Sequence, residues 1–319
     1  MTPQKERILV IRLGALGDLV FCFQSFHEIR LAHPDAEIAL LTRAPFAALA
    51  QAMPWFDRVI IDTHPTFTQP LAWARLVKEI KAFAPTRVYD LQGKKRQSIL
   101  YTLLGGCLKL EWSGTAPLCQ FPRVWPPTPT MHFTDFLAAQ LRVAHVPAAL
   151  PPDLAWCDAP VERFALPPPY AVLVPGCSPK ALTKRWPPEK YAEAANGLRA
   201  RNLSCVVVGT HADAAAVAAI KAAVPDVINL CGQTTLFELA GILRRAAIVI
   251  GNDTGPVHLG AAMGAPTLAL FSGKTNPVWS KPPGKTVIWR QSPVLTDLSV
   301  REVLFALDLL LQHAKGKGR

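Results

Sequence analysis

A polar loop in the second half of the chain has the residue types of an anion-binding site. The stretch 248–271 reads IVIGNDTGPVHLGAAMGAPTLALF, so a polar turn separates an apolar strand from a helix that begins near Pro256. The free N–H groups and the dipole at this helix start favour a phosphate, Gly255 lets it approach the backbone, and His258 falls in the first turn. The alternative is helix capping by Asp253 or Thr254, which explains one polar residue but not the set.

A basic loop, 174–195, follows the first strand of the same half and reads VPGCSPKALTKRWPPEKYAEAA. Lysines in such a loop can neutralise a diphosphate without a metal. The basic side chains concerned are Lys180, Lys184 and Arg185. The alternative is a solvated basic loop with no ligand.

An acidic residue, Asp213, comes shortly after the apolar run 204–209. An acid beyond the second strand of a nucleotide-binding domain is well placed for ribose hydroxyls. Asp213 is equally suited to stabilise a helix N-terminus through the dipole. The sequence leaves both roles open.

A glycine turn near the start of the chain ends in a carboxylate. Residues 11–26 read IRLGALGDLVFCFQSF. They are not a dinucleotide fingerprint, because Arg12 stands where the first glycine of G-x-G-x-x-G should be. Gly14 and Gly17 allow backbone and ligand to approach closely. Asp18 lies at a helix start, where it either takes part in chemistry or stabilises the helix dipole.

Two series of strands and helices must position these loops. In the first, apolar runs at 8–13, 37–42, 58–62 and 87–92 predict parallel strands, with helices at 17–32, 70–83 and 94–104. In the second, strands are predicted at 170–175, 204–209, 227–230, 246–251 and 266–271, with helices at 188–201, 211–223, 235–245 and 256–263. Thr235 and Glu238 form a capping box at the start of helix 235–245.

A proline-rich segment separates the two series, with seven prolines between residues 147 and 169. Proline fixes φ and removes a backbone donor, so this segment is a stiff connector. We therefore predict an α/β protein of two tandem Rossmann-like, doubly wound domains, 1–155 and 156–319, with a cleft between them. The last helix is allowed to pack back on the first domain. Ligands of such sheets bind beyond the carboxyl ends of the strands, where all these loops fall.

The formal charge of +11 in 319 residues predicts an acidic partner: a nucleotide phosphate, a phosphorylated lipid, an anionic membrane surface or nucleic acid. The plain alternative is a soluble protein from a Lys/Arg-rich proteome. We expect no nucleic-acid partner, because no basic stripe with interleaved aromatics and no known module is found.

The targeting and cysteine patterns predict a cytoplasmic protein. The N-terminus does not read as a signal peptide, and no run approaches the length of a spanning helix. The seven cysteines form no C-x-x-C pair, so we expect them reduced and mostly buried. The histidines lack metal-ligand spacing and no D-x-D occurs, so no metal is expected.

The chain resembles the ADP-heptose:lipopolysaccharide heptosyltransferases, family nine of the glycosyltransferases. The resemblance covers nearly the whole chain and rests on four stretches in order: RLGALGD (12–18), DLQG (90–93), PG…KRWP (175–187) and NDTGPVHL (252–259). Ser272, before Gly273, and Asn276 depart from the family pattern in a loop that shapes the nucleotide side.

The resemblance implies a GT-B fold in which the first domain binds the acceptor and the second binds the nucleotide-sugar donor. It implies inverting, metal-independent transfer of heptose from ADP-L-glycero-D-manno-heptose to the Kdo or heptose of the lipopolysaccharide inner core, with no cofactor. Asp18 is assigned the role of the base. The donor residues are Ser178, Lys184, Asp213, Asp253, Thr254, Gly255 and His258. The acceptor residues are Arg12, Gly14, Gly17, Lys94, Lys95 and Arg96.

Several alternatives stay open. Residues 94–96 are otherwise a solvated helix face, and Asp90 and Gln92 are structural or touch the acceptor. Asp253 is expected to hold sugar hydroxyls rather than phosphate, which it would repel. Rival functions are a transferase of the same fold with another nucleotide-sugar or acceptor, and a non-catalytic GT-B binding module. The acceptor, lipid A–Kdo or core oligosaccharide, also predicts peripheral contact with the cytoplasmic face of the inner membrane. The basic tail 313–319 either contributes to this contact or is simply disordered.

Overall fold

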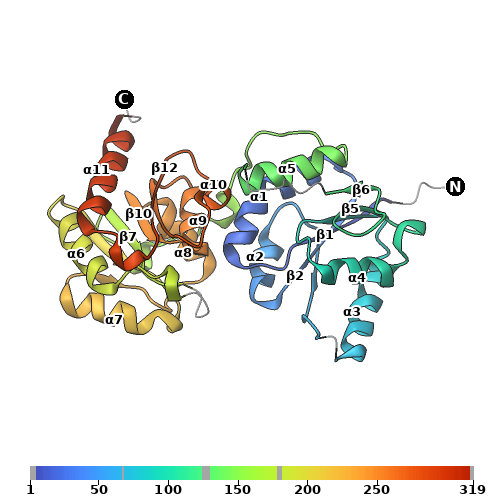
Figure 1. The fold of residues 1–319 in the computed structure, drawn as a ribbon, viewed down its shortest axis with the longest axis horizontal. Coiled ribbons are helices and arrows are strands. Elements are labelled where there is room, and N and C mark those ends of the chain that lie inside the picture. The colour runs from blue at the N-terminus through green and yellow to red at the C-terminus, as the bar shows by residue number, and fades with distance from the viewer. Residues whose placement is uncertain (1–4, 67, 124–129, 178–181, 317–319) are drawn as a thin grey trace. The chain divides into compact units, whose positions relative to one another are not determined.

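A computed structural model describes residues 5–66, 68–123, 130–177 and 182–316 of the chain. The chain divides into two compact units, Met1–Trp156 and Cys157–Arg319 (Figure 1). This division lies inside the proline-rich segment, next to the expected boundary at residue 155. Each unit contains a six-stranded parallel sheet with helices, which confirms the predicted α/β class.

The first sheet has the strand order β3-β2-β1-β4-β5-β6. Its strands are β1 (Arg7–Ile11), β2 (Glu37–Thr42), β3 (Arg58–Ile61), β4 (Arg87–Asp90), β5 (Glu111–Gly114) and β6 (Phe121–Pro122). The helices of this unit are α1 (Leu16–Ala32), α2 (Ala47–Ala52), α3 (Pro70–Phe83), α4 (Lys95–Leu104) and α5 (Phe133–Val143). Chain order reverses between β1 and β4, and such a switch point is where doubly wound sheets bind ligands.

Both faces of the first sheet are buried, as continuous apolar strands require. Leu9 and Ile11 of β1 pack in a cluster with Leu76 and Ile80 of α3 and with Leu100 of α4. The intervening residues of β1 are buried as well, and α1 packs against α5. Thus α3 and α4 lie together on one face of the sheet.

The second sheet has the order β12-β11-β10-β7-β8-β9, so its switch point lies between β7 and β10. Its strands are β7 (Tyr170–Val174), β8 (Ser204–Val207), β9 (Ile228–Asn229), β10 (Ile248–Asn252), β11 (Thr267–Ser272) and β12 (Val287–Ser292). The helices are α6 (Pro188–Arg199), α7 (Ala214–Ala223), α8 (Leu236–Arg244), α9 (Gly255–Ala262), α10 (Pro277–Ser280) and α11 (Val300–Gly316).

The last helix covers its own unit. α11 packs against α6 and against β10, β11 and β12, and its Val303 and Leu307 are fully buried in the core of the second sheet. The sequence had also allowed packing on the first unit. At the start of α8, Thr235 and Glu238 form the predicted capping box.

Sequence reasoning assigned no element to α2, β5, β6, α5, α10 or β12. It also extended β4 by two residues. The strand ends at Asp90 because its Oδ1 accepts hydrogen bonds from the backbone N–H groups of Gln92 and Gly93, which turns the chain.

All seven cysteines lie in the described part and are free thiols. Five are buried, as expected, whereas Cys107 is exposed and Cys231 is half-buried. Among the described residues, no helix is both long and apolar enough to cross a membrane.

Candidate functional site

The first group of polar residues lies at the switch point of the first sheet, where Ile11 pairs with Asp90. The chain leaves β1 through Arg12 and enters α1 at Leu16. It leaves β4 through Leu91 and Gln92. Gln92 Oε1 accepts a hydrogen bond from the Leu13 N–H at 3.0 Å, so this side chain, whose role the sequence left open, joins the two loops.

A buried arginine, Arg12, forms an ion pair with the Asp18 carboxylate. Arg12 Nη2 lies 2.8 Å from Asp18 Oδ1; the Asp18 side chain is 44% exposed and that of Arg12 is 4% exposed. Arg12 Nη1 donates to the Leu91 carbonyl at 2.6 Å, and its guanidinium stacks 5.2 Å from the centre of the Phe133 ring. Asp18 Oδ2 accepts from the Ala15 N–H at 2.9 Å. The carboxylate therefore has a fixed position and an open side.

The turn between Arg12 and Asp18 requires its first glycine. Gly14 has φ +99°, and a Cβ there would lie 2.2 Å from Phe46 Cε2. Gly17 is buried inside the first turn of α1. Both predicted glycines thus shape the loop that carries Asp18, and the close approach at Gly14 is to Phe46.

A buried network of polar side chains holds the end of β4 at this edge of the sheet. Arg123 Nη2 donates to the Asp90 carbonyl at 2.6 Å, and Arg123 Nε donates to Gln140 Oε1 at 2.5 Å. Burial raises the pKa of the Asp90 carboxyl, against the lowering effect of Arg123 and the two backbone amides. Burial also lowers the pKa of Arg123 to about 10, although Asp90 opposes that shift. Asp90 is fully buried, and its carboxylate holds the turn after β4 through the Gln92 and Gly93 N–H groups.

The three basic residues at the start of α4 separate into two kinds. Lys94 and Lys95 are exposed. Arg96 instead donates to both carboxylate oxygens of Asp62, at 2.8 and 3.0 Å, and stacks 4.2 Å from the centre of the Trp73 ring. Arg96 is thus not part of a solvated face but ties α4 to the loop after β3, and its acceptor role stays a prediction.

The second group lies at the switch point of the second sheet and is centred on Asp253. Asp253 Oδ2 lies 2.5 Å from Lys184 Nζ and 3.3 Å from Thr275 Oγ1, and its Oδ1 lies 3.2 Å from His258 Nε2. The Asp253 side chain is 8% exposed and that of Lys184 is 31% exposed. Lys184, Asp253 and His258 are therefore brought together as one charged cluster beside the start of α9.

The electrostatics of this cluster favour ionised Asp253. Its burial favours the neutral acid, but hydrogen bonds from His258 and Lys184 outweigh that effect and lower the pKa of Asp253. Thr254 is the N-cap residue of α9 and Gly255 its first residue. The Thr254 hydroxyl donates to the Asn252 carbonyl at 3.1 Å rather than capping the helix N–H groups. Pro256 has no N–H, and the Val257 and His258 N–H groups donate to the Thr254 carbonyl at 3.1 and 3.2 Å, so this helix start offers an anion the Gly255 N–H and the helix dipole.

Asp213 lies directly before α7, a position consistent with the helix-dipole role that the sequence offered beside ribose binding. Its Oδ2 accepts from the N–H and the hydroxyl of Thr210, both at 2.9 Å. Oδ1 lies 3.8 Å from Arg185 Nη2. A Cβ at Gly176 would lie 2.5 Å from Asp213 Cγ, so only glycine lets the loop after β7 pass this carboxyl.

Sequence reasoning gave no role to Asn252, which joins the two loops of the second switch point. Its Oδ1 accepts from the Trp186 N–H at 3.0 Å and from the Tyr191 hydroxyl at 3.1 Å, and its Nδ2 donates to the Pro175 carbonyl at 2.8 Å. Asn252 and Trp186 are buried. Their contact fixes the chain two residues after Lys184. A polar residue at the end of a buried strand was the available signal.

Ser178, a predicted donor residue, and Lys180 of the basic loop lie outside the described residues. In the loop after β11, Ser272 is buried, and Asn276 Oδ1 caps α10 by accepting from the Val278 N–H at 3.0 Å. The departure from the family pattern at Asn276 thus has a local structural role.

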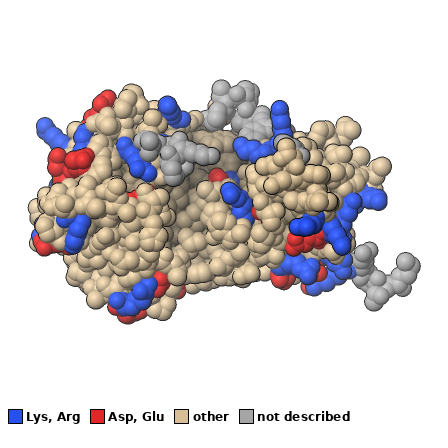
Figure 2. All heavy atoms as spheres, turned by 90° about the horizontal axis from the view of Figure 1, so that it is seen from below, with Lys and Arg blue, Asp and Glu red and all other residues tan. Residues whose placement is uncertain are grey.

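Within the described residues, no three His, Cys, Asp or Glu side chains form a group that could hold a metal ion. Figure 2 shows Lys and Arg side chains scattered over the visible face of each unit, without a continuous stripe.

The sequence and fold are similar to known proteins. Residues 73–294 match the model of glycosyltransferase family 9 (heptosyltransferase). The chain is 25% identical to lipopolysaccharide heptosyltransferase 1 of Pseudomonas aeruginosa over 88% of this chain and 82% of that protein. A 104-residue stretch is 32% identical to lipooligosaccharide heptosyltransferase 2 of Haemophilus influenzae, covering 31% of this chain and 30% of that protein.

Among solved structures, the E. coli ADP-heptose lps heptosyltransferase II aligns with a TM-score of 0.77 and 22% identity, covering 97% of this chain and 99% of that one. This likeness extends over both units and confirms the expected GT-B architecture of two Rossmann-like domains.

Proposed function

Because the chain belongs to glycosyltransferase family 9 and is a glycosyltransferase, we propose that it transfers heptose from ADP-heptose to the inner core of lipopolysaccharide, with inversion and without a metal ion. The observation that carries the proposal is the Lys184–Asp253–His258 cluster at the start of α9. The names of the similar heptosyltransferases support the donor and the lipopolysaccharide acceptor.

The donor site proposed on the second unit rests on charge and open backbone donors. A diphosphate is attracted by Lys184 and by the Gly255 N–H and dipole at the start of α9, and these groups stabilise the charge that grows on the leaving phosphate. Asp253 is a carboxylate and would repel phosphate, so it is suited to hold Lys184 and to accept hydrogen bonds from sugar hydroxyls. His258, held by Asp253, is suited to a phosphate oxygen.

The base proposed on the first unit is Asp18. In an inverting transfer an acceptor hydroxyl attacks the anomeric carbon from the side opposite the diphosphate, loses its proton to the base, and expels ADP. Asp18 has a carboxylate with an open side and an orientation fixed by Arg12. Arg12 is then a positioning residue rather than an acceptor contact, because its guanidinium is buried and paired. Lys94 and Lys95 are the exposed candidates for the acceptor's acidic groups.

The experiment is a transfer assay with a donor panel. ADP-heptose, ADP-glucose, a UDP-sugar and a GDP-sugar are each combined with lipid A–Kdo and with a heptosylated core, in the presence and absence of EDTA, and the product's anomeric configuration is read by NMR. We expect transfer from ADP-heptose, unaffected by EDTA, with an inverted anomeric centre. Transfer from another donor alone would reassign the substrate. Activity lost in EDTA and restored by magnesium, or retention of configuration, would refute the mechanism.

The acceptor is a lipid-linked sugar in this proposal, so we also propose peripheral attachment to the cytoplasmic face of the inner membrane. The formal charge of +11 supports attraction to an anionic surface.

A further inference from the structure

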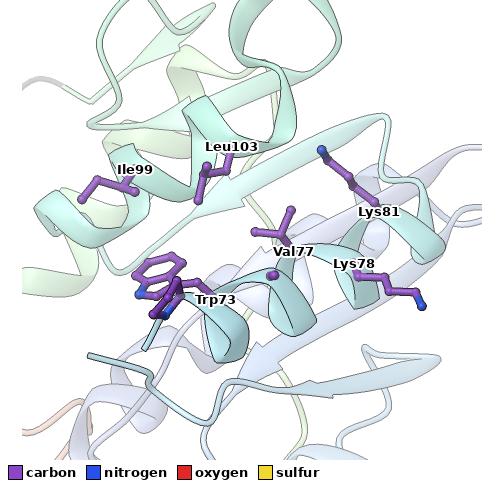
Figure 3. A pocket seen from close by; sticks show the side chains of 8 residues that line it. Trp73, Val77, Lys78, Lys81, Ile99 and Leu103 are labelled. Atoms are coloured by element: carbon purple, nitrogen blue, oxygen red, sulfur yellow. The ribbon is translucent and has the colours of Figure 1, made fainter. Parts of the chain in front are cut away.

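A groove lies between α3 and α4 on the first unit (Figure 3). Its volume is about 680 Å³, within the range of about 300–1,000 Å³ that is typical of small-molecule sites. Figure 3 shows Trp73 and Val77 of α3 and Ile99 and Leu103 of α4 around it, with two lysines further along α3. The complete lining is Pro70, Trp73, Ala74, Val77, Lys78, Lys81, Ile99 and Leu103.

The helix surfaces that line the groove are mostly apolar although they face solvent. Six of its eight lining residues are apolar, and Ile99 and Leu103 are 38% and 43% exposed. Leu71, in the first turn of α3, is 74% exposed. The inner faces of both helices already bury Leu76, Ile80 and Leu100 against the sheet. The outer apolar residues therefore form a second, solvent-facing apolar strip, which indicates a binding surface.

Charge around this strip is mainly positive. Lys78 and Lys81 line the groove, and Arg75 is exposed on the same helix. Glu79 is the acidic residue in the sequence of α3, and α4 has none. A lysine can cover apolar surface with its stem while its ammonium reaches a phosphate. An apolar groove with two lysines is complementary to an anionic amphiphile with a long hydrocarbon chain.

One end of the groove adjoins the edge of the sheet that carries the loops with Asp18 and Lys94. Trp73, at that end, stacks under Arg96, the second residue of α4, which follows the loop after β4. Arg96 also donates to the Pro65 carbonyl at 2.8 Å in the loop before α3. A lipid seated between α3 and α4 would thus lie on the unit proposed to bind a lipid-linked acceptor.

We propose that the α3–α4 groove receives an acyl chain of an anionic membrane phospholipid, with the headgroup phosphate at Lys78 and Lys81. The inference rests on the proposed function only for its biological setting, because the acceptor is held in the same membrane. The binding is non-covalent and combines burial of a hydrocarbon chain with attraction of basic side chains to the lipid surface.

The test is flotation of the full chain with phosphatidylglycerol vesicles and with phosphatidylcholine vesicles. We expect binding to the anionic vesicles that weakens with salt. Lys78→Glu with Lys81→Glu should weaken it about 25-fold or more, since each basic residue near such a surface contributes about fivefold. Leu103→Asp should weaken it to a similar degree, because a carboxylate would enter the hydrocarbon contact. Circular dichroism verifies that each variant is folded.

Matched controls change the same charge and the same residue types elsewhere. Lys5→Glu with Arg301→Glu alters net charge equally at exposed positions, and Leu31→Asp alters a leucine that is 55% exposed on α1. Both should keep wild-type vesicle binding within about twofold. Equal losses in controls and groove variants would show a general charge effect and overturn the proposal, as would absence of vesicle binding.

A second measurement locates the lipid acyl chain in the groove without weakening vesicle binding. Vesicles with brominated acyl chains should quench part of the tryptophan fluorescence, and Trp73→Phe should remove that part. Quenching unchanged in Trp73→Phe would overturn the proposal. So would a dimer in sedimentation that is dissociated by Leu103→Asp, because the groove would then hold a second copy.

The transfer reaction is followed separately with an acceptor from which the acyl chains have been removed. The groove variants should keep wild-type turnover on that acceptor while losing vesicle binding. Vesicle binding with no transfer in the wild type would refute the proposed function alone. Transfer without groove-dependent vesicle binding would refute this inference alone.

Discussion

The Arg12 guanidinium holds the Asp18 carboxylate at 2.8 Å while it donates to the Leu91 carbonyl at 2.6 Å. One buried side chain thus joins the loop after β1, the loop after β4 and the first turn of α1. The acid it holds is the exposed partner of the pair. This asymmetry is suited to a base whose position is fixed and whose free side accepts a proton.

Asp18→Asn should lower turnover by about 10²- to 10⁴-fold, the usual contribution of a general base. The variant should stay folded, because the side chain is 44% exposed and the amide keeps an oxygen for the Ala15 N–H. Steady-state transfer rates and a thermal melt measure the two effects. Asp35→Asn, at an exposed turn, is the control. Turnover within twofold of wild type would leave Asp18 only its role at the helix start.

Arg12→Lys should lower kcat by about 10²-fold with little change in the donor KM, because misplacement of a reacting group by about 1 Å has that effect. Lysine keeps the charge but cannot contact Asp18 and the Leu91 carbonyl as a planar fork or stack on Phe133 in the same way. A rise in acceptor KM with unchanged kcat would instead restore Arg12 as an acceptor contact. The control is Arg43→Lys, an exposed arginine after β2.

Local sequence patterns were sufficient for the elements that hold the site. The predicted bounds of β2 and α3 agree with the structure, since each is a short apolar run or an amphipathic segment with clear ends. β5 and β6 had no comparable signal, because their sequences, EWSG and FP, contain no run of apolar or β-branched residues.

The pairings of charged residues could not be read from the sequence. Arg96 meets Asp62 across 34 residues and Arg12 meets the carbonyl of Leu91 across 79, so both contacts depend on strand order. The sequence therefore did not predict that Arg12 and Arg96 make these structural contacts, and their acceptor roles stay untested predictions. By contrast, Lys184, Asp253 and His258 were each singled out, because they lie in loops whose position at a switch point follows from topology alone.

Lys184→Gln should weaken ADP binding by about 10- to 150-fold, the worth of a hydrogen bond to a charged group. Adenosine should bind the variant and the wild type equally, because it lacks the diphosphate. Isothermal titration with both ligands separates the phosphate contribution from any change in the base pocket, and Lys5→Gln is the control. An equal loss for adenosine would show that Lys184 acts through the fold and not through phosphate.

The contribution of Asp253 to stability should depend on pH. Hydrogen bonds from His258 and Lys184 outweigh burial and lower its pKa below the ordinary 3.8. The folded carboxyl therefore binds a proton less tightly than the unfolded one. Its stabilising effect is complete above the unfolded value and is lost as pH falls through the lower folded pKa.

Asp253→Asn lacks this titration. Urea unfolding should show a difference in free energy between wild type and variant that is larger at about pH 7 than at about pH 3. Asp35→Asn should show no such narrowing. A difference that is the same at both pH values would mean that packing, and not the ionised carboxylate, accounts for the effect of the substitution.

Asn252→Ala should destabilise the protein by about 2–4 kcal/mol, because it leaves the buried Trp186 N–H, Tyr191 hydroxyl and Pro175 carbonyl without this partner. It should also raise the donor KM, since the Trp186 contact fixes the chain next to the Lys184 loop. Urea unfolding and initial rates measure the two effects. Asn196→Ala, on the exposed side of α6, should leave both near wild type. Loss of stability with an unchanged KM would separate the fold of this loop from donor binding and restrict Asn252 to a structural role.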